Sequence, residues 1–502
     1  MRSESRRFLV LGLDGATFDL LDPLMAEGEM PFLARLAGGG LRAPLASVYP
    51  PKTIPAWYSF ATGLDPGALG IFGFTEPDGG PGKSRLVQTY RPTEAVWDRL
   101  GRLGHSVGVI NFPLRAGHPL NGFVLPGMLS DRPPTWPEGL REEVERALGE
   151  PLIPELPPYR EAQRDEWMGL ATRAVDQRAR ATEALVRARR PDFLFVLFRE
   201  TDRIQHQHWS ELTGPPGRVG EDLRRFWRQI DRALERIDTA FRAEGRPAVT
   251  LVVSDHGHGA ARSDFFTNRW LEAEGFLRFR NGGTDRRRGL VARLLVTVDR
   301  IPGGRRLLRP LADRLRSSPR LDALSTAVGG AATFEAVAPR IDWERTIAYS
   351  YPVPEGIYLN RYNPSLTAET ARDSIREIRR RLESYPGARI EVLSPARLYR
   401  GTRLGNAPAL LLRIDGLATE PRMDFSYPRP MLKERPGYFY GSGVHRMNGI
   451  LVASGDGVRA ERVSEPFSLL DLAPTILAAM GAPVPASMGG RSFADRLGGA
   501  GG

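Results

Sequence analysis

The sequence predicts an α/β fold in which helices cover both faces of a mostly parallel central sheet. Short runs that are apolar on both faces are typical of central parallel strands, and amphipathic helical stretches separate these runs, as in a layered sandwich. The expected strands are "FLVLGL" from Phe8, "SVGVINF" from Ser106, "DFLFVLF" from Asp192, "VTLVVS" from Val249 and "GILVASG" from Gly449.

Three helices have clear sequence signals. Residues 160–190 repeat charged and apolar residues at helical spacing, which predicts a long surface helix before the strand that contains Phe193–Phe198. "IPAWYSFATG" can begin a helix with Pro55 in its first turn. Near the end, "LAPTILAAM" follows Asp471 and precedes Gly481, which predicts a closing helix.

We expect three parts in the chain: residues 1–275 as the first part of a catalytic α/β core, 276–340 as an inserted arginine-rich cap, and 341–502 as the second part of the core with the closing helix. Between Arg278 and Arg320 arginines are frequent and the glycine pairs "NGG" and "PGG" interrupt the pattern. This segment has two interpretations, a solvated helical surface or a surface for an anionic substrate or a membrane.

The composition argues against a nucleic-acid-binding protein and excludes sites that contain cysteine. The net charge is +11, but the only lysines are Lys52, Lys83 and Lys433, so the basic charge is almost all arginine. This skew indicates a coding bias, and no nucleic-acid-binding motif accompanies it. The chain has no cysteine, which excludes disulfides and thiolate ligands, so oxygen and nitrogen atoms would have to hold any metal ion.

No apolar run approaches the roughly 20 residues of a transmembrane span. The run Phe8–Leu13 follows basic residues, as in a signal peptide, but it is too short for one and lacks a small-residue cleavage site. We therefore interpret it as the first core strand and expect a cytoplasmic location.

Several of the 7 histidines lie beside carboxylates just after expected strands, where α/β sheets build their sites. Asp202 and His206 are four residues apart and would share one face of a helical turn. Each candidate has an alternative: Asp14 as a helix cap, Asp202 as a partner of Arg203, and His445 as a loop histidine. The candidate ligands are Asp14, Asp202, His206, Asp255, His256 and His445.

Thr53 is a candidate nucleophile because it precedes the expected helix "IPAWYSFATG". A helix N-terminus favours an anionic phosphate, and a metal ion bound to the hydroxyl would lower its pKa. The alternative is a simple N-cap, a position that threonine often occupies.

The ordered motifs "GLDG", "PPKTIPAW" followed by "TG", "TDRIQH", "SDHG" and "GVHRMNG" resemble the alkaline phosphatase superfamily. The resemblance is greatest to the branch of type I phosphodiesterases and nucleotide pyrophosphatases, with its predicted phosphohydrolases and phosphomutases. It extends from about Phe8 to the expected closing helix, and it implies an alkaline-phosphatase-like layered α/β sandwich with an inserted cap.

The resemblance also implies two divalent metal ions, Zn²⁺ in the first place and Mn²⁺ as the alternative. One ion would be held by Asp14, Thr53, Asp255 and His256, and the other by Asp202, His206 and His445. Thr53 would carry a covalent phosphoryl intermediate. His258 is expected either behind the ligands or facing solvent.

The sequence departs from this branch in one respect. Nucleotide pyrophosphatases of the superfamily usually have an asparagine about twenty residues after the nucleophile, near a His-Gly pair, whereas this chain has Leu69 and Phe74 at the corresponding positions. Phosphate stabilisation would then come from Lys52 or from a backbone amide of the helix. "TIPAW" also lacks the Cys/Ser pattern of a sulfatase.

The sequence thus predicts a metal-dependent phosphohydrolase, in the first place a phosphodiesterase, that acts on a small anionic phosphoester. The alternatives are a phosphomutase or phosphomonoesterase that acts on a small phosphorylated metabolite, and a non-catalytic binding protein braced by metal ions. The sequence predicts neither the substrate nor the oligomeric state.

Overall fold

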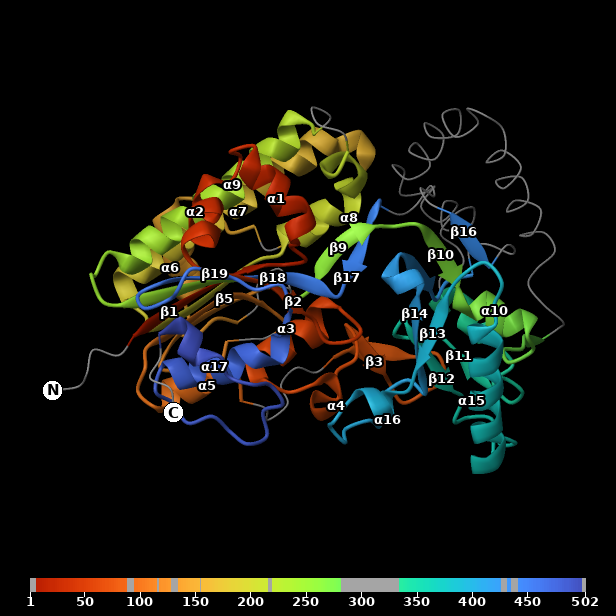
Figure 1. Ribbon diagram of the computed structural model, residues 1–502. Helices are drawn as coiled ribbons and strands as arrows, with labels where there is room; N and C mark the ends of the chain where they lie inside the picture. The colour runs from red at the N-terminus through yellow and green to blue at the C-terminus, as the bar shows by residue number, and fades with distance from the viewer. Residues whose placement is uncertain are drawn as a thin grey trace.

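The computed structural model describes residues 6–87, 94–114, 117–127, 134–153, 155–214, 219–280, 334–425, 431–434 and 441–498. The described chain forms a large α/β lobe and, beside it, an outer lobe with its own sheet (Figure 1). Most of the expected cap, residues 281–333, lies outside the described residues, so its role stays a prediction.

The large sheet has the strand order β19-β2-β18-β8-β1-β7-β5-β6, with β20 beside β2. Its strands are β1 (Arg7–Leu13), β2 (Leu41–Ala46), β5 (Val107–Pro113), β6 (Gly122–Gly127), β7 (Phe193–Phe198), β8 (Ala248–Val253), β18 (Asn448–Gly455), β19 (Glu461–Arg462) and β20 (Phe467–Ser468). Strands β8, β1, β7, β5 and β6 pair in parallel. Every residue of β1, β7 and β8 is buried, as expected for strands that are apolar on both faces. The prediction of an α/β fold with a mostly parallel sheet is confirmed.

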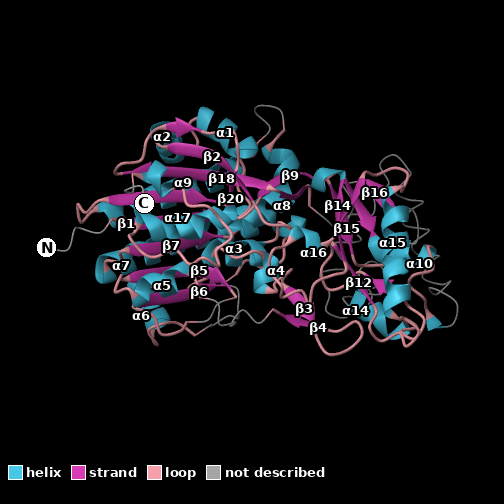
Figure 2. Cartoon of the chain, turned by 60° about the horizontal axis from the view of Figure 1, so that its bottom comes forward, coloured by secondary structure: helices cyan, strands magenta, loops and turns pink. Residues whose placement is uncertain are grey.

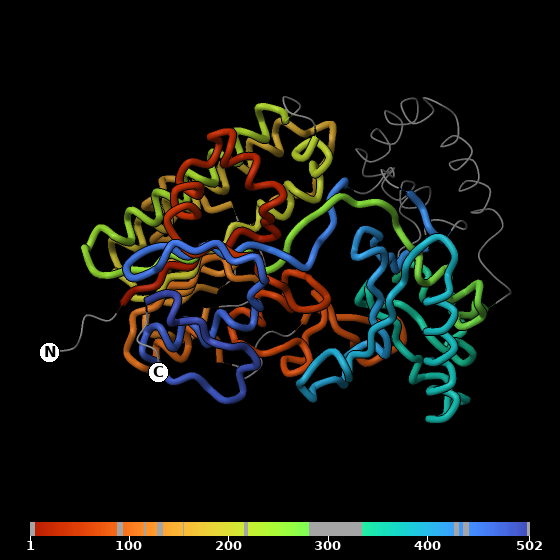
Figure 3. Tube along the Cα trace, viewed as in Figure 1, coloured from red at the N-terminus to blue at the C-terminus, as the bar shows by residue number. Residues whose placement is uncertain are grey.

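One predicted strand runs in the other direction. Strand β18 is antiparallel to both of its neighbours, β8 and β2. It directly follows β17 (Gly443–Arg446), which pairs with β9 (Gly257–Ala260) just beyond the end of β8. The chain therefore enters the sheet at the edge where the parallel strands end, and it can only run back from there. Figure 3 shows this C-terminal segment beside the N-terminal strand β2.

Helices cover both faces of the large sheet, as Figures 1 and 2 show. One face packs against α1 (Phe18–Ala26), α2 (Pro31–Gly39), α6 (Leu140–Leu148), α7 (Arg164–Arg189), α8 (Glu200–Leu212) and α9 (Glu221–Arg242), and the exposed turn η1 (Glu161–Gln163) leads into α7. The other packs against α3 (Thr53–Thr62), α4 (Pro66–Leu69), α5 (Val96–Arg102), η5 (Leu469–Asp471), α17 (Leu472–Ala479) and η6 (Ala494–Leu497). Helices α7, α3 and α17 lie where the sequence predicts helices.

The outer lobe contains a second sheet with the order β11-β12-β14-β15-β10-β16, and β13 beside β14. Its strands are β10 (Ser263–Phe266), β11 (Ala348–Tyr349), β12 (Gly356–Leu359), β13 (Ile390–Leu393), β14 (Leu410–Ile414), β15 (Thr419–Arg422) and β16 (Leu432–Glu434). Its helices are α10 (Thr267–Ala273), α14 (Phe334–Val337), η3 (Ala338–Arg340), α15 (Ala368–Glu383), α16 (Pro395–Leu398) and η4 (Asp415–Leu417). A small hairpin of β3 (Thr75–Pro77) and β4 (Ser84–Leu86) lies outside both large sheets.

This lobe changes the expected division of the chain. Residues 341–502 are expected to form the second part of the α/β core. The described residues 341–434 contribute to the second sheet and to a separate hydrophobic core. Strand β10 also belongs to that sheet, although it precedes residue 275. The chain returns to the large sheet only at β18, because the short strands of the outer lobe pair with one another.

In the described part of the chain, no helix combines the length and the apolar character that a bilayer crossing requires. The cytoplasmic location stays a prediction.

Candidate metal centre

Residues from distant parts of the sequence meet at the edge where the parallel strands end. Asp14 directly follows β1, Asp202 and His206 lie on α8 just after β7, and Asp255 and His256 directly follow β8. Since β8, β1 and β7 are adjacent in the sheet, their carboxyl ends lie next to one another. The loops thus converge at the kind of position where α/β sheets bind ligands.

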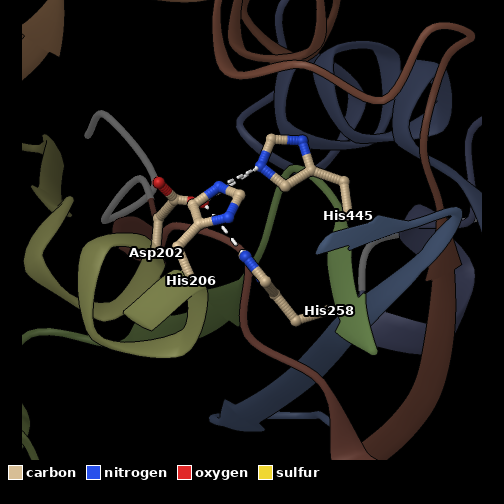
Figure 4. Close-up of side chains that lie close together, drawn as sticks. All are labelled: Asp202, His206, His258 and His445. Atoms are coloured by element: carbon tan, nitrogen blue, oxygen red, sulfur yellow. Dashed lines mark hydrogen bonds and ion pairs between the residues drawn. The ribbon is translucent and has the colours of Figure 1, made fainter. Parts of the chain in front are cut away.

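The first group of side chains is centred on Asp202 (Figure 4). The Oδ1 atom of Asp202 lies 3.2 Å from Nε2 of His445 and 3.4 Å from Nε2 of both His206 and His258. The Nε2 atoms of His206 and His445 are 2.8 Å apart. The alternative partner of Asp202 is therefore not realised, since Arg203 instead contacts Glu155.

Of the two positions expected for His258, facing solvent is wrong and lying behind the ligands stays open. It is completely buried, and the pairing of β9 with β17 places it directly opposite His445. The sequence contains a signal for this position, because residues i and i+2 of an extended strand share one face. His256 and His258 have that spacing.

The second group contains Asp14, Asp255 and His256. The Nε2 atom of His256 lies 3.5 Å from Oδ1 of Asp14 and 3.3 Å from Oδ2 of Asp255. The other oxygens of the two carboxylates accept hydrogen bonds from Nε1 of Trp57 and from the amide of Gly15, each at 3.2 Å. Asp14 is not a helix cap, because the N-cap of α1 is Thr17. Asp202 also lies within reach of Asp14 and His256, so it connects the two groups.

Several polar atoms in this centre are buried without a hydrogen-bond donor among the described residues. They are Oδ1 of Asp14, Oδ2 of Asp255, and Nε2 of His256 and of His258. A buried polar atom without a partner destabilises the fold. These atoms are carboxylate oxygens and imidazole nitrogens that point toward one another. Such side chains are suitable ligands for divalent metal ions.

Burial is the main cause of the pKa shifts of the carboxyl and imidazole groups in this centre. It raises the pKa of Asp14 and of Asp255 well above the usual range, and the negative charges of Asp202 and Asp14, respectively, raise them further. Burial alone would also raise the pKa of Asp202, but the neighbouring histidines, His206 first, outweigh it and hold this pKa low. Burial lowers the pKa of His256, His258 and His445, which favours neutral imidazoles. The carboxylates thus repel one another, and bound cations would relieve the repulsion.

Thr53 lies at the start of α3 and is buried, with 5% of its surface exposed. The N-cap is Lys52, whose carbonyl accepts the amide of Ala56 at 3.0 Å, so Thr53 is the first residue of the helix and not its cap. Trp57, one turn further along α3, donates to Asp14, and Nδ1 of His445 lies 2.7 Å from the carbonyl of Pro51. These contacts hold the start of α3 against both ligand groups. The interpretation of Thr53 as a simple N-cap does not agree with the structure, because the N-cap is Lys52.

Lys52, the candidate phosphate-binding residue, has a partner in the outer lobe. Its Nζ atom lies 2.8 Å from Oε1 of Glu355, whose side chain is buried. Burial alone would lower the pKa of Lys52, but Glu355 and Glu420 outweigh it and the pKa is raised. The lysine is therefore charged and already paired. Glu355 has no signal in the sequence that links it to this centre.

Leu69 and Phe74 do not supply a polar group to the centre. Leu69 is buried in α4, and Phe74 packs against the same hydrophobic core as α3. The structure thus agrees with the sequence that the asparagine typical of nucleotide pyrophosphatases has no counterpart at these positions.

The chain resembles solved structures along nearly its whole length. The alkaline phosphatase PafA superposes with a TM-score of 0.57 at 16% identity, covering 98% of this chain and 99% of that one. Murine ectonucleotide pyrophosphatase / phosphodiesterase 5 gives a TM-score of 0.54 at 14% identity, covering 99% and 100%. The phosphonoacetate hydrolase of Sinorhizobium meliloti 1021 gives 0.53 at 15% identity, covering 95% and 96%. These similarities confirm the alkaline-phosphatase-like fold.

The family itself follows from the sequence profile of type I phosphodiesterases / nucleotide pyrophosphatases, which matches residues 8–310, more than half of the chain. The match confirms the resemblance of the ordered motifs and the expectation of a hydrolase that acts on phosphoric ester bonds. The chain therefore belongs to the type I phosphodiesterase / nucleotide pyrophosphatase family.

Proposed function

We propose that this protein is a phosphodiesterase that uses two divalent metal ions and Thr53 as its nucleophile, and that its substrate is a small anionic phosphodiester. The observation that supports this proposal best is the pair of buried ligand groups joined by Asp202 at the start of α3. Zn²⁺ is the expected ion and Mn²⁺ the alternative, because the ligands are nitrogen and oxygen atoms only.

The two groups suggest how the ions would be held. Asp14, Asp255 and His256 would bind one ion together with Thr53, while Asp202, His206 and His445 would bind the other. When bound, the ions would neutralise the buried carboxylates, lower the pKa of the Thr53 hydroxyl and stabilise negative charge on the phosphoryl oxygens.

The chain's own residues supply the rest of the chemistry. The oxygen of Thr53 attacks phosphorus, the bond to one alcohol breaks, and the hydroxyl proton is transferred overall to the leaving oxygen. The intermediate is a phosphodiester between Thr53 and the second alcohol. Water then attacks its phosphorus and breaks the bond to the Thr53 oxygen, which restores the hydroxyl and releases a phosphomonoester. The amides in the first turn of α3 favour the anionic phosphoryl group at Thr53.

The alternatives differ in their products. A phosphomutase would return the phosphoryl group of Thr53 to its substrate and release no alcohol. A phosphomonoesterase would release inorganic phosphate, and a non-catalytic binding protein would not need Thr53. The family supports the diesterase over these alternatives.

The substitution Thr53→Ala tests the proposal. Because the structure gives the hydroxyl no capping role, we expect a folded, metal-loaded variant whose turnover of an aryl phosphodiester falls at least about a hundredfold. Thr53→Ser keeps a hydroxyl and should retain much of the activity. Steady-state kinetics, metal content and thermal melting measure these effects, and mass spectrometry of quenched wild-type protein should find the adduct on Thr53.

Thr62→Ala is the matched control, since Thr62 is a buried threonine at the other end of α3 that donates to the carbonyl of Tyr58. It should lower the melting temperature without a comparable loss of turnover. Wild-type turnover in metal-loaded Thr53→Ala would contradict the nucleophilic role.

A further inference from the structure

Three imidazoles of the first ligand group each place Nδ1 beside a backbone carbonyl oxygen. The Nδ1 atoms of His206, His258 and His445 lie 3.0, 2.9 and 2.7 Å from the backbone carbonyl oxygens of Gly443, Gly15 and Pro51, respectively. A carbonyl oxygen can only accept, so each Nδ1 carries a proton, and each neutral ring has a lone pair on Nε2. Metal-binding histidines are typically oriented in this way, by a hydrogen bond from the ring nitrogen that does not bind the ion.

The three lone pairs converge on one carboxylate oxygen (Figure 4). Oδ1 of Asp202 is 3.4, 3.4 and 3.2 Å from Nε2 of His206, His258 and His445, respectively. A tetrahedral ion with bonds of about 2.0–2.1 Å separates its ligand atoms by about 3.3 Å. His258 matches this separation as well as His206 and His445 do.

These four atoms cannot satisfy one another. All are acceptors, and one added proton could join only two of them, such as the Nε2 atoms of His206 and His445 at 2.8 Å. Nε2 of His258 would then remain 3.4 Å from Oδ1 of Asp202 without a donor, in a fully buried position. One divalent cation would satisfy all four acceptors at once.

The surroundings hold His258 in place. Its strand pairs with that of His445, and its ring stacks on Trp209 with centroids 6.3 Å apart. Gly15 has a φ of +68°, and a Cβ atom at that position would lie 2.5 Å from the His258 ring. The backbone at residue 15 thus lies so close to the His258 ring that only glycine is tolerated there.

We propose that His258 is a fourth protein ligand of the ion that Asp202, His206 and His445 hold, so that three nitrogens and one oxygen bind it. This inference rests on the proposed function, because it assumes an ion at Asp202.

The test is the substitution His258→Asn in the full chain. The asparagine amide can replace Nδ1–H in the hydrogen bond to Gly15, but it has no atom at the position of Nε2. We expect the variant to bind one of its two ions at least about tenfold more weakly than the wild type, as measured by competition with a chelator. His118→Asn is the control, since His118 contacts Asp98 away from the centre, and its ion affinities should not change.

Proton NMR of the Co²⁺-loaded protein distinguishes a ligand from a neighbour. Each coordinated histidine gives one strongly shifted, exchangeable Nδ1–H signal, and we expect four from His206, His256, His258 and His445. His258→Asn should show three. If this variant does not fold, His258→Phe, which keeps a ring beside Trp209, should show the same loss.

The outcomes separate the two proposals. A wild-type protein that binds no divalent ion would overturn the proposed function together with this inference. A wild type that binds two ions but shows only three shifted signals would overturn the role of His258 alone, as would unchanged ion affinity in the folded His258→Asn variant.

Discussion

Because two carboxylates lie beside His256, we expect Asp255→Asn to have opposite effects on the free energy of unfolding with and without divalent ions. Asp255 and Asp14 approach the same nitrogen of His256 to 3.3 and 3.5 Å. Their charges are therefore less than about 7 Å apart, where two like charges repel by about 2 kcal/mol at an effective dielectric constant near 20. Asparagine has nearly the same shape and removes this repulsion.

In metal-free protein we expect Asp255→Asn to raise the free energy of unfolding by about 2 kcal/mol, or the melting temperature by about 2 °C in a chain of this size. In Zn²⁺-loaded protein the variant should melt below the wild type, because it has lost a ligand. Thermal unfolding of both proteins, first dialysed against EDTA and then reloaded, measures the two effects.

The pH dependence has a definite sign. Burial, together with the charge of Asp14, raises the pKa of Asp255 in the folded state. A raised carboxyl pKa means that the wild type loses stability as the pH rises from the unfolded-state pKa through the folded one. The advantage of metal-free Asp255→Asn should thus be present at pH 8 and vanish below about pH 3, where the carboxyl is protonated in both states.

Asp238→Asn is the matched control. Asp238 is also a buried carboxylate, but Nε of Arg242 donates to it at 3.0 Å, so its charge is favourable. Its replacement should lower the melting temperature with and without ions. If metal-free Asp255→Asn at pH 8 is destabilised in the same way, the carboxylates do not repel as the structure indicates, and the reasoning is wrong.

Two further predictions concern acid and the outer lobe. Burial lowers the pKa of His256, His258 and His445, so the folded state loses stability as the pH falls below the unfolded histidine value of about 6.5. Protons then also displace the metal ions. Metal analysis after dialysis at pH 5 and pH 8 should show the loss of ions only at pH 5. If Lys52 binds the substrate phosphate, Lys52→Met should raise KM several-fold. Glu355→Gln should lower KM, because the Lys52 ammonium loses its competing carboxylate. A change in melting temperature without any change in KM would instead identify the ion pair as a structural link between the lobes.

The sequence predicts the positions of those residues of the centre that depend on local patterns. Asp14 and Asp255 follow apolar strands, and neighbouring parallel strands bring their carboxyl ends together whatever the rest of the chain does. The helical spacing of Asp202 and His206 likewise places both on one face of α8. The ion pair of Lys52 with Glu355 could not be predicted, because it depends on the position of the outer lobe against the start of α3.

The outer lobe itself escaped prediction because its strands are short and pair across long sequence distances. Strand β10 is four residues long, and its neighbours β15 and β16 lie more than a hundred residues further along the chain. No local periodicity indicates such pairing. The direction of β18 is unpredictable for a related reason, since apolar character on both faces indicates a central strand but does not determine which way it runs.

The pairing of β9 with β17 also affects how this protein can vary. The chain leaves the large lobe through β9 and returns through β17, and the two strands are neighbours in one antiparallel ladder that the bond from Ala261 to Ser442 extends. The ladder fixes the distance between the exit and the re-entry, so the intervening segment closes a loop whose ends are already joined. Because the entropy of closing a loop grows only slowly with its length, insertions or deletions in the outer lobe would cost little and would leave His258 and His445 in place. The outer lobe can therefore change in length during evolution while the residues of the candidate metal centre keep their positions.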